Sequence, residues 1–246
     1  MSDNSELHPT LQPDYHIAER VRIQTEVFPQ KFRELHEGGQ LAEILRNPTT
    51  LPGARVDQAP EVFTEQYLIE PVLHGLGYLN PTSEKYEAGK PHFIRQPITY
   101  QNIEPNQPDY LIKNIDSSVV CIVEAKAANK ERMSGTKQYA TDDIQEYLEE
   151  DTFCKYLRDI DQQYLIGIGT DGFRWTLWVK DLETGETHAD APKVDLSPAV
   201  ERAAIRLDTI DGEVAEGRET ERKALLEDFI PAFAADNLLS HVQSKF

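Results

Sequence analysis

Two acidic residues and one lysine stand at a spacing that suits chemistry on phosphate esters. Asp109 precedes the segment Glu124-Ala125-Lys126, which ends an apolar run over residues 119–123. Side chains alternate between the two faces of a β-strand, so Glu124 and Lys126 should project from one face and Ala125 from the other. An apolar run that ends in this way delivers a carboxylate and an ammonium group to the end of a buried strand.

A hairpin would bring Asp109 to the same face. If residues 116–117 form the turn between two antiparallel strands, Asp109 stands opposite Glu124. Two carboxylates and the ammonium group of Lys126 then converge. A Glu-x-Lys pair alone is an everyday solvent-facing pair, but the order of these three residues and the hairpin between them favour a catalytic cluster.

Such a cluster has the chemistry of a metal-dependent enzyme that hydrolyses phosphodiesters. One or two carboxylates hold Mg²⁺, which keeps several waters and binds phosphate oxygens. The metal lowers the pKa of a bound water, while a nearby ammonium group offsets developing negative charge. We therefore expect Asp109 and Glu124 to be metal ligands, Lys126 to be catalytic, and Mg²⁺ to be the cofactor, with Mn²⁺ able to substitute.

The segments around the cluster predict the elements that hold it. A helix should begin with Thr64 as its cap and be kinked or divided by Pro71. Its apolar residues keep helical spacing: Tyr67, Leu68, Val72, Leu73 and Leu76. Extended segments are expected over 93–100, 109–112 and 119–125, and the last two form a hairpin.

The rest of the chain predicts further helices and one more hairpin. We expect a helix over about residues 138–157, whose acidic residues form a solvated face, and a hairpin over 164–179 that turns at Asp171-Gly172. After Pro192 the chain should turn helical again. A C-terminal apolar stripe should pack on the core or, alternatively, dock another subunit; it comprises Leu225, Leu226, Phe229, Ile230, Phe233, Leu238, Leu239 and Val242.

Pro108-Asp109 followed by Glu124-Ala125-Lys126 resembles the signature of PD-(D/E)XK nucleases. Residues 64–78 resemble the first helix of the nuclease domain in type I restriction enzyme R subunits, and residues 167–175 are similar to a later segment of that domain. Together the motifs cover about residues 60–180. The resemblance implies an α/β, restriction-endonuclease-like core, in which helices flank a mixed β-sheet, with a helical C-terminal extension.

The resemblance also implies roles for individual residues. The carbonyl of Ala125 matches an additional metal ligand, and Glu65 matches an acidic residue that helps shape the metal site. The alternative for Glu65 is a helix-start acid stabilised by the helix dipole. Relatives carry Gln-x-x-x-Tyr after the lysine, whereas Gln138 is followed four residues on by Asp142. Gln138 is therefore either a supporting catalytic residue or a solvent-facing one.

The implied activity is cleavage of DNA in restriction or defence against foreign DNA. R subunits couple their nuclease to an ATP-driven motor, but this chain has no Gly-x-x-x-x-Gly-Lys-Ser/Thr loop, so we expect no nucleotide cofactor. The protein would act alone or with separate specificity, methyltransferase or motor subunits. Lys130, Arg132 and Lys137 are candidate contacts to DNA phosphates, with a solvated loop as the alternative.

The composition is strongly acidic, with 43 acidic and 25 basic residues and a formal net charge of −18. A surface of this charge repels nucleic acid at low salt. The acidic excess indicates either an ordinary solvated surface or adaptation to concentrated salt. Apolar runs of about five residues fall short of the roughly 20 that span a bilayer. No apolar signal segment is seen, so we expect a cytoplasmic protein. Scattered histidines give no support to zinc or serine-triad chemistry.

We expect three divisions of the chain. Residues 1–58 comprise a flexible tail, which ends at about residue 15, and an N-terminal helical segment. A nuclease-like domain follows over 59–195, and a helical extension over 196–246. Two other functions stay open. A nuclease-like fold kept as a non-catalytic DNA-binding or assembly subunit would bind metal without cleaving DNA. An acidic mimic of DNA would bind its partner even after Asp109 is replaced.

Overall fold

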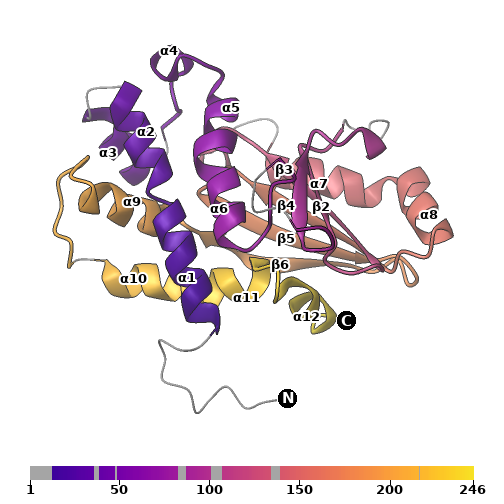
Figure 1. Cartoon of the computed structure of the whole chain (residues 1–246). Helices are drawn as coiled ribbons and strands as arrows, with labels where there is room; N and C mark the ends of the chain where they lie inside the picture. The colour runs from indigo at the N-terminus through magenta and orange to yellow at the C-terminus, as the bar shows by residue number, and fades with distance from the viewer. Residues whose placement is uncertain are drawn as a thin grey trace.

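The protein folds around a mixed β-sheet that lies between two helical layers (Figure 1). The computed structural model describes residues 13–35, 39–47, 49–82, 87–100, 107–133, 139–215 and 217–246. Within the described residues, six strands lie in chain order, and among these strands β3 and β4 are the parallel pair. The expectation of a mixed sheet flanked by helices is confirmed.

Each strand pairs with the next along the chain. The strands are β1 (His92–Arg95), β2 (Tyr110–Lys113), β3 (Val119–Ala125), β4 (Tyr164–Thr170), β5 (Arg174–Asp181) and β6 (Thr187–Asp195). In the β2–β3 hairpin, Tyr110 pairs with Val123 and Leu111 with Ile122, which is the predicted register. The hairpin turn carries Asn114 with a positive φ and an Asp116 side chain that accepts from the Ser118 amide.

Two helices cover one face of the sheet, α7 (Ala140–Glu149) and α8 (Asp151–Asp159). They pack on the side chains of Val120 and Ile122 from β3. The first helices of the opposite layer are α1 (Pro13–Gln24), α2 (Val27–Leu35), α3 (Gly39–Arg46), α4 (Gly53–Val56), α5 (Pro60–Thr64) and α6 (Glu70–Gly75). Its later helices are α9 (Ser197–Arg206), α10 (Arg218–Lys223), α11 (Ile230–Phe233) and α12 (Leu238–Gln243).

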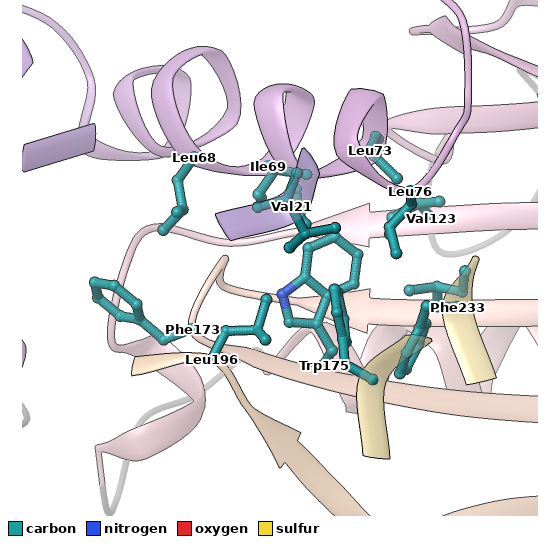
Figure 2. Close-up of a cluster of buried hydrophobic side chains, with 14 of the residues drawn as sticks. Val21, Leu68, Ile69, Leu73, Leu76, Val123, Phe173, Trp175, Leu196 and Phe233 are labelled. Carbon is teal, nitrogen blue, oxygen red and sulfur yellow. The ribbon is translucent and has the colours of Figure 1, made fainter. Parts of the chain in front are cut away.

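The larger hydrophobic cluster joins this second layer to the other face of β3, through Cys121, Val123 and Ala125. Trp175 of β5 lies at its centre, with Val21 of α1 and Phe233 of α11 nearby (Figure 2). The ring of Trp175 meets that of Phe229 at 5.3 Å between centroids. The C-terminal stripe therefore packs on the core, as the first of its two interpretations predicted. No helix in the described part of the chain is long and apolar enough to span a membrane.

The first helix of the expected nuclease domain begins earlier than predicted. It starts at Pro60 with α5, continues as a π-helical segment η3 (Glu65–Ile69), and ends in α6. Thr64 is not its cap: its hydroxyl donates to the Pro60 carbonyl at 2.8 Å. Pro71 does not divide the helix, since the backbone stays helical over residues 60–75. It lies near the start of α6, directly after the π-helical turn, where the helical hydrogen bonding is already altered.

Four other boundaries differ from the sequence expectations. The extended segment expected over 93–100 ends with β1 at Arg95, and the chain then forms the 3₁₀ helix η4 (Ile98–Tyr100). Helix α1 includes residues 13–15, which were assigned to a flexible tail, and residues 1–12 lie outside the described chain. The helix expected over 138–157 is two helices, since the backbone of Glu150 is extended and its side chain caps α8. The chain also continues as strand β6 through Pro192 before α9 begins.

Candidate active site

The predicted cluster lies where the two parallel strands end. Ala125 of β3 pairs with Thr170 of β4, and the Lys126 amide donates to the Thr170 carbonyl at 2.9 Å. Parallel strands bring their carboxyl ends to one edge, and in open α/β sheets ligands bind outside that edge. The loop that follows β3, the turn between β4 and β5, and the start of α7 all reach this edge.

Lys126 forms ion pairs with two carboxylates. Its Nζ lies 2.6 Å from Glu124 Oε1 and 2.8 Å from Asp143 Oδ2 of α7. The Lys126 side chain is only 15% exposed. Burial lowers the pKa of Lys126, but the charges and hydrogen bonds of Glu124 and Asp143 outweigh burial and raise it. Lys126 therefore stays an ammonium group at neutral pH.

Asp109 lies beside this pair, as the hairpin register predicted. Its Oδ2 accepts from the Ala125 amide at 2.8 Å, which ties it to the end of β3. Burial and the charge of Asp109 raise the pKa of Glu124 to about 8. Burial likewise raises the pKa of Asp109, although the Ala125 amide and Lys126 act in the opposite direction. The buried carboxylate of Glu124 and the partly buried carboxylate of Asp109 thus repel each other.

Helix α7 supplies two residues that the sequence did not suggest. Besides Asp143, the Tyr147 hydroxyl donates to Glu124 Oε2 over 3.5 Å. Asp143 and Tyr147 are four residues apart and lie on the helix face that covers β3. The interpretation of the acidic residues of this helix as a solvated face is therefore wrong for Asp143. The signal that identifies it is the i, i+4 spacing from a buried aromatic residue.

On the first helix, Glu61 interacts most closely with this cluster. Burial raises the pKa of Glu61. The charge of Lys126 lowers this pKa, while the charges of Asp109 and Asp143 raise it. It was not predicted, because the helix was expected to start only at residue 64. We call Glu61, Asp109, Glu124, Lys126 and Asp143 the edge cluster.

Glu65, the helix acid that the resemblance suggested, belongs mainly to a different network. Its Oε2 accepts from the Tyr110 hydroxyl at 2.8 Å and pairs with Arg95 Nη2 at 3.0 Å. Arg95 also pairs with Glu70, at 3.7 Å. Burial raises the pKa of Glu65. The hydrogen bond from Tyr110 and the charge of Arg95 lower this pKa, and the charge of Asp109 raises it more weakly. We call Glu65, Glu70, Arg95 and Tyr110 the helix–sheet network.

Backbone and side-chain hydrogen bonds hold the loop that follows Lys126. The Ala128 amide donates to the Thr64 hydroxyl at 2.9 Å. The buried side chain of Asn129 donates to the carbonyls of Ile44 and Thr49 at 2.7 and 2.8 Å. These contacts explain why Thr64 lies inside the helix: it positions the loop beside the edge cluster.

Asp171 joins the same loop to the β4–β5 turn. Its fully buried carboxylate accepts from the amides of Glu131, Phe173 and Arg174 at 2.7 to 3.0 Å. Burial raises the pKa of Asp171 to about 6, although the backbone amides act in the opposite direction. The adjacent Gly172 has φ +82°, the conformation that the predicted turn needs.

The three residues predicted to contact DNA differ in their surroundings. Arg132 donates to the Leu45 carbonyl at 3.2 Å and to Asn129 Oδ1 at 3.0 Å, so it helps to anchor the loop. Lys130 is partly exposed in the short 3₁₀ helix η5 (Lys130–Arg132), and its charge acts on Glu61. Lys137 and Gln138 lie outside the described residues.

No known protein family, curated protein or solved structure matches this chain.

The donor set was compared with the needs of a divalent metal. The described residues contain no group of three or more His, Cys, Asp or Glu side chains placed to hold a metal ion. Asp109 and Glu124 do fit the smaller requirement of Mg²⁺, which takes one or two carboxylates and fills its other positions with water. Their mutual repulsion, which contributes to the raised pKa of Glu124, is the feature that a cation would relieve.

Proposed function

We propose that the protein is a Mg²⁺-dependent endonuclease that hydrolyses DNA phosphodiester bonds, in restriction or defence against foreign DNA. The observation that carries this proposal is the edge cluster, in which Asp109 and Glu124 lie with Lys126 at the carboxyl ends of β3 and β4. The proposed fold is a restriction-endonuclease-like core. Its support is the mixed sheet in which the β1–β3 meander leads through α7 to a parallel strand.

Four residues of the edge cluster have a proposed task, namely Asp109, Glu124, Lys126 and Asp143. Asp109, Glu124 and the carbonyl of Ala125 would hold Mg²⁺, which when bound supplies an acidified water and neutralises charge on the phosphate. The ammonium group of Lys126 would offset the negative charge that develops on the phosphate. Asp143 acts through Lys126, because its carboxylate fixes the Nζ position at 2.8 Å.

DNA must approach a protein of net charge −18, so binding depends on local positive charge and on salt. Lys130 is the described basic residue nearest in sequence to Lys126 and is proposed to contact a phosphate. Separate specificity, methyltransferase or motor subunits are the proposed partners that would choose the DNA site. The proposed location is the cytoplasm.

Plasmid cleavage tests the proposal. Wild type is incubated with supercoiled DNA and Mg²⁺ or Mn²⁺ from low to molar KCl, beside Asp109→Asn and Lys126→Met. The exposed neighbour variant Asp142→Asn is the matched control, and circular dichroism establishes that each variant is folded in each buffer. Asp109→Asn is chosen because its amide oxygen can still accept from the Ala125 amide.

We expect metal-dependent cutting by wild type and by Asp142→Asn, with loss of cutting in the other two variants. Cutting that persists in folded Asp109→Asn and Lys126→Met would contradict the site. Metal binding by folded wild type without cutting at any salt would favour a non-catalytic subunit. Partner binding that survives Asp109→Asn, in the absence of cutting, would favour an acidic DNA mimic.

A further inference from the structure

A second site lies in the helical layer opposite α7, where α1, α9 and α10 come together (Figure 1). A pocket of about 660 Å³ opens there, bounded also by the segment before α10 and by the π-helical turn η6 (Ala224–Phe229). Five arginines contribute to its lining: Arg22, Arg202, Arg206, Arg218 and Arg222. Glu19 and Glu221 line it as well, and Glu19 pairs with Arg22 at 2.8 Å.

The inner wall holds two arginines in fixed positions. Arg202 Nε and Arg206 Nη1 donate to the two oxygens of Glu221, at 2.5 and 3.0 Å. Arg206 Nε also donates to Glu26 at 3.2 Å, yet its Nη2 is buried without a hydrogen-bond partner. Buried N–H donors are normally satisfied, so Arg206 retains one donor group that its own carboxylate partners do not use.

The outer wall carries arginines that are accessible. Arg218 is exposed, with no hydrogen-bond or ion-pair partner among the described residues. Arg222 is half exposed and pairs with Glu219 of the same helix turn at 2.6 Å. Exposed pairs of this kind contribute little stability, so Arg222 can exchange its partner for a ligand at low cost.

Apolar side chains form the remaining surface of the pocket. Ala18, Val214, Leu225 and Leu226 belong to its lining beside the arginines. A cavity of this size matches the range of about 300–1,000 Å³ in which proteins bind small organic molecules. The combination of apolar wall and guanidinium groups suits a ligand that has both an apolar body and an anionic group.

We propose that this pocket binds a small organic oxyanion, either a phosphate monoester or a carboxylate, through Arg218 and Arg222. The planar guanidinium fork matches both groups because it donates two parallel hydrogen bonds. Arg202 and Arg206 form the inner wall, where Glu221 and Glu26 balance their charge, and Leu225 and Leu226 contact the apolar body. The site does not depend on the proposed nuclease activity.

Isothermal titration of the full chain in dilute buffer tests the proposal with four probes. Phenyl phosphate and benzoate carry both an apolar ring and an oxyanion, inorganic phosphate lacks the ring, and benzyl alcohol lacks the charge. The test variant is Arg218→Gln/Arg222→Gln, whose positions are exposed. The control is Lys155→Gln/Arg158→Gln, which removes the same charge from exposed positions of α8.

We expect phenyl phosphate or benzoate to bind at least about tenfold more tightly than inorganic phosphate and benzyl alcohol, which is a difference of about 1.4 kcal/mol. The arginine variant should lose at least tenfold in affinity, and the α8 variant should keep the wild-type value. The tighter of the two ring probes shows whether the natural ligand is a phosphate ester or a carboxylate. No binding of either ring probe at millimolar concentration, or equal affinity in both variants, would overturn the proposal.

Discussion

The edge cluster and the helix–sheet network use the same components with different results. In the first, Lys126 pairs with Glu124 and Asp143, and the hydroxyl of Tyr147 reaches Glu124. In the second, Arg95 takes the place of the lysine and pairs with Glu65 and Glu70 of the first helix. The hydroxyl of Tyr110 donates to Glu65. In both places one cation pairs with two carboxylates, and a tyrosine hydroxyl donates to one of them.

Position and charge balance separate the two. The edge cluster adds two further carboxylates, of which Asp109 contributes to the raised pKa of Glu124, and it lies where parallel strands end. In the helix–sheet network the Tyr110 hydroxyl at 2.8 Å and the 38% exposed Arg95 stabilise the Glu65 carboxylate. We infer that the first arrangement is suited to a cation and a phosphate, whereas the second fastens a helix to the sheet.

The largest expected difference is between the two cations. Lys126→Met should lower the initial rate of plasmid cleavage by about 100- to 1,000-fold, the usual effect of removing one group that stabilises transition-state charge. Arg95→Met should lower it by less than about tenfold, because Arg95 pairs with carboxylates outside the edge cluster. Equal losses in the two variants would remove the distinction between the networks.

The loop that supports the edge cluster should be sensitive to Asp171. Asp171→Ala leaves one buried and two partly buried backbone amides without an acceptor, so the free energy of unfolding should fall by about 3 kcal/mol in urea denaturation. The matched change Asp116→Ala removes an exposed turn carboxylate that accepts from Ser118, and it should cost less than about 1 kcal/mol. A cost for Asp171→Ala as small as that of Asp116→Ala would show that the turn does not anchor the loop.

The pH dependence of stability should follow Glu124. Because its pKa is raised from 4.5 to about 8, the folded chain binds a proton more tightly than the unfolded chain between those values. Stability in EDTA should therefore fall as pH rises through this window, by at most about 1.4 kcal/mol per pH unit. Urea denaturation across the window should show a clearly smaller slope for Glu124→Gln, and Glu65→Gln should retain most of the wild-type slope.

The smallest expected effects on cleavage come from replacing the two acids of the first helix, Glu61 and Glu65. Glu61→Gln should reduce cleavage about tenfold, since its charge interacts with Lys126 and Asp109, while Glu65→Gln should reduce it by less than about threefold. Initial rates measured at one salt concentration, with folding checked for each variant, decide the order. A larger loss for Glu65→Gln would restore the role that the resemblance suggested for that residue.

The sequence predicted the part of the site that depends on period-two alternation. The apolar run before Glu124 and the turn residues around Asp116 were enough to specify the hairpin register, and with it the position of Asp109. Glu61 was missed because Thr64 resembled a helix cap, although Pro60 is a typical first helical residue and was the better signal.

Other features depend on tertiary contacts that the local sequence does not specify. The role of Asp143 is set by which face of α7 packs on β3, so a run of acidic residues alone could not distinguish it from its exposed neighbours. Strand β6 contains Pro192 and several polar residues, which disfavour a central strand. It lies at the edge of the sheet, where proline is tolerated.

Mn²⁺ binding measured by isothermal titration tests most directly whether the edge cluster is a metal site. Wild type and Glu65→Gln should bind the ion with similar affinity, while Asp109→Asn and Glu124→Gln should each bind it at least about tenfold more weakly. Binding that is unchanged in Asp109→Asn and Glu124→Gln, or that is lost in Glu65→Gln alone, would contradict the assignment of the metal to the edge cluster.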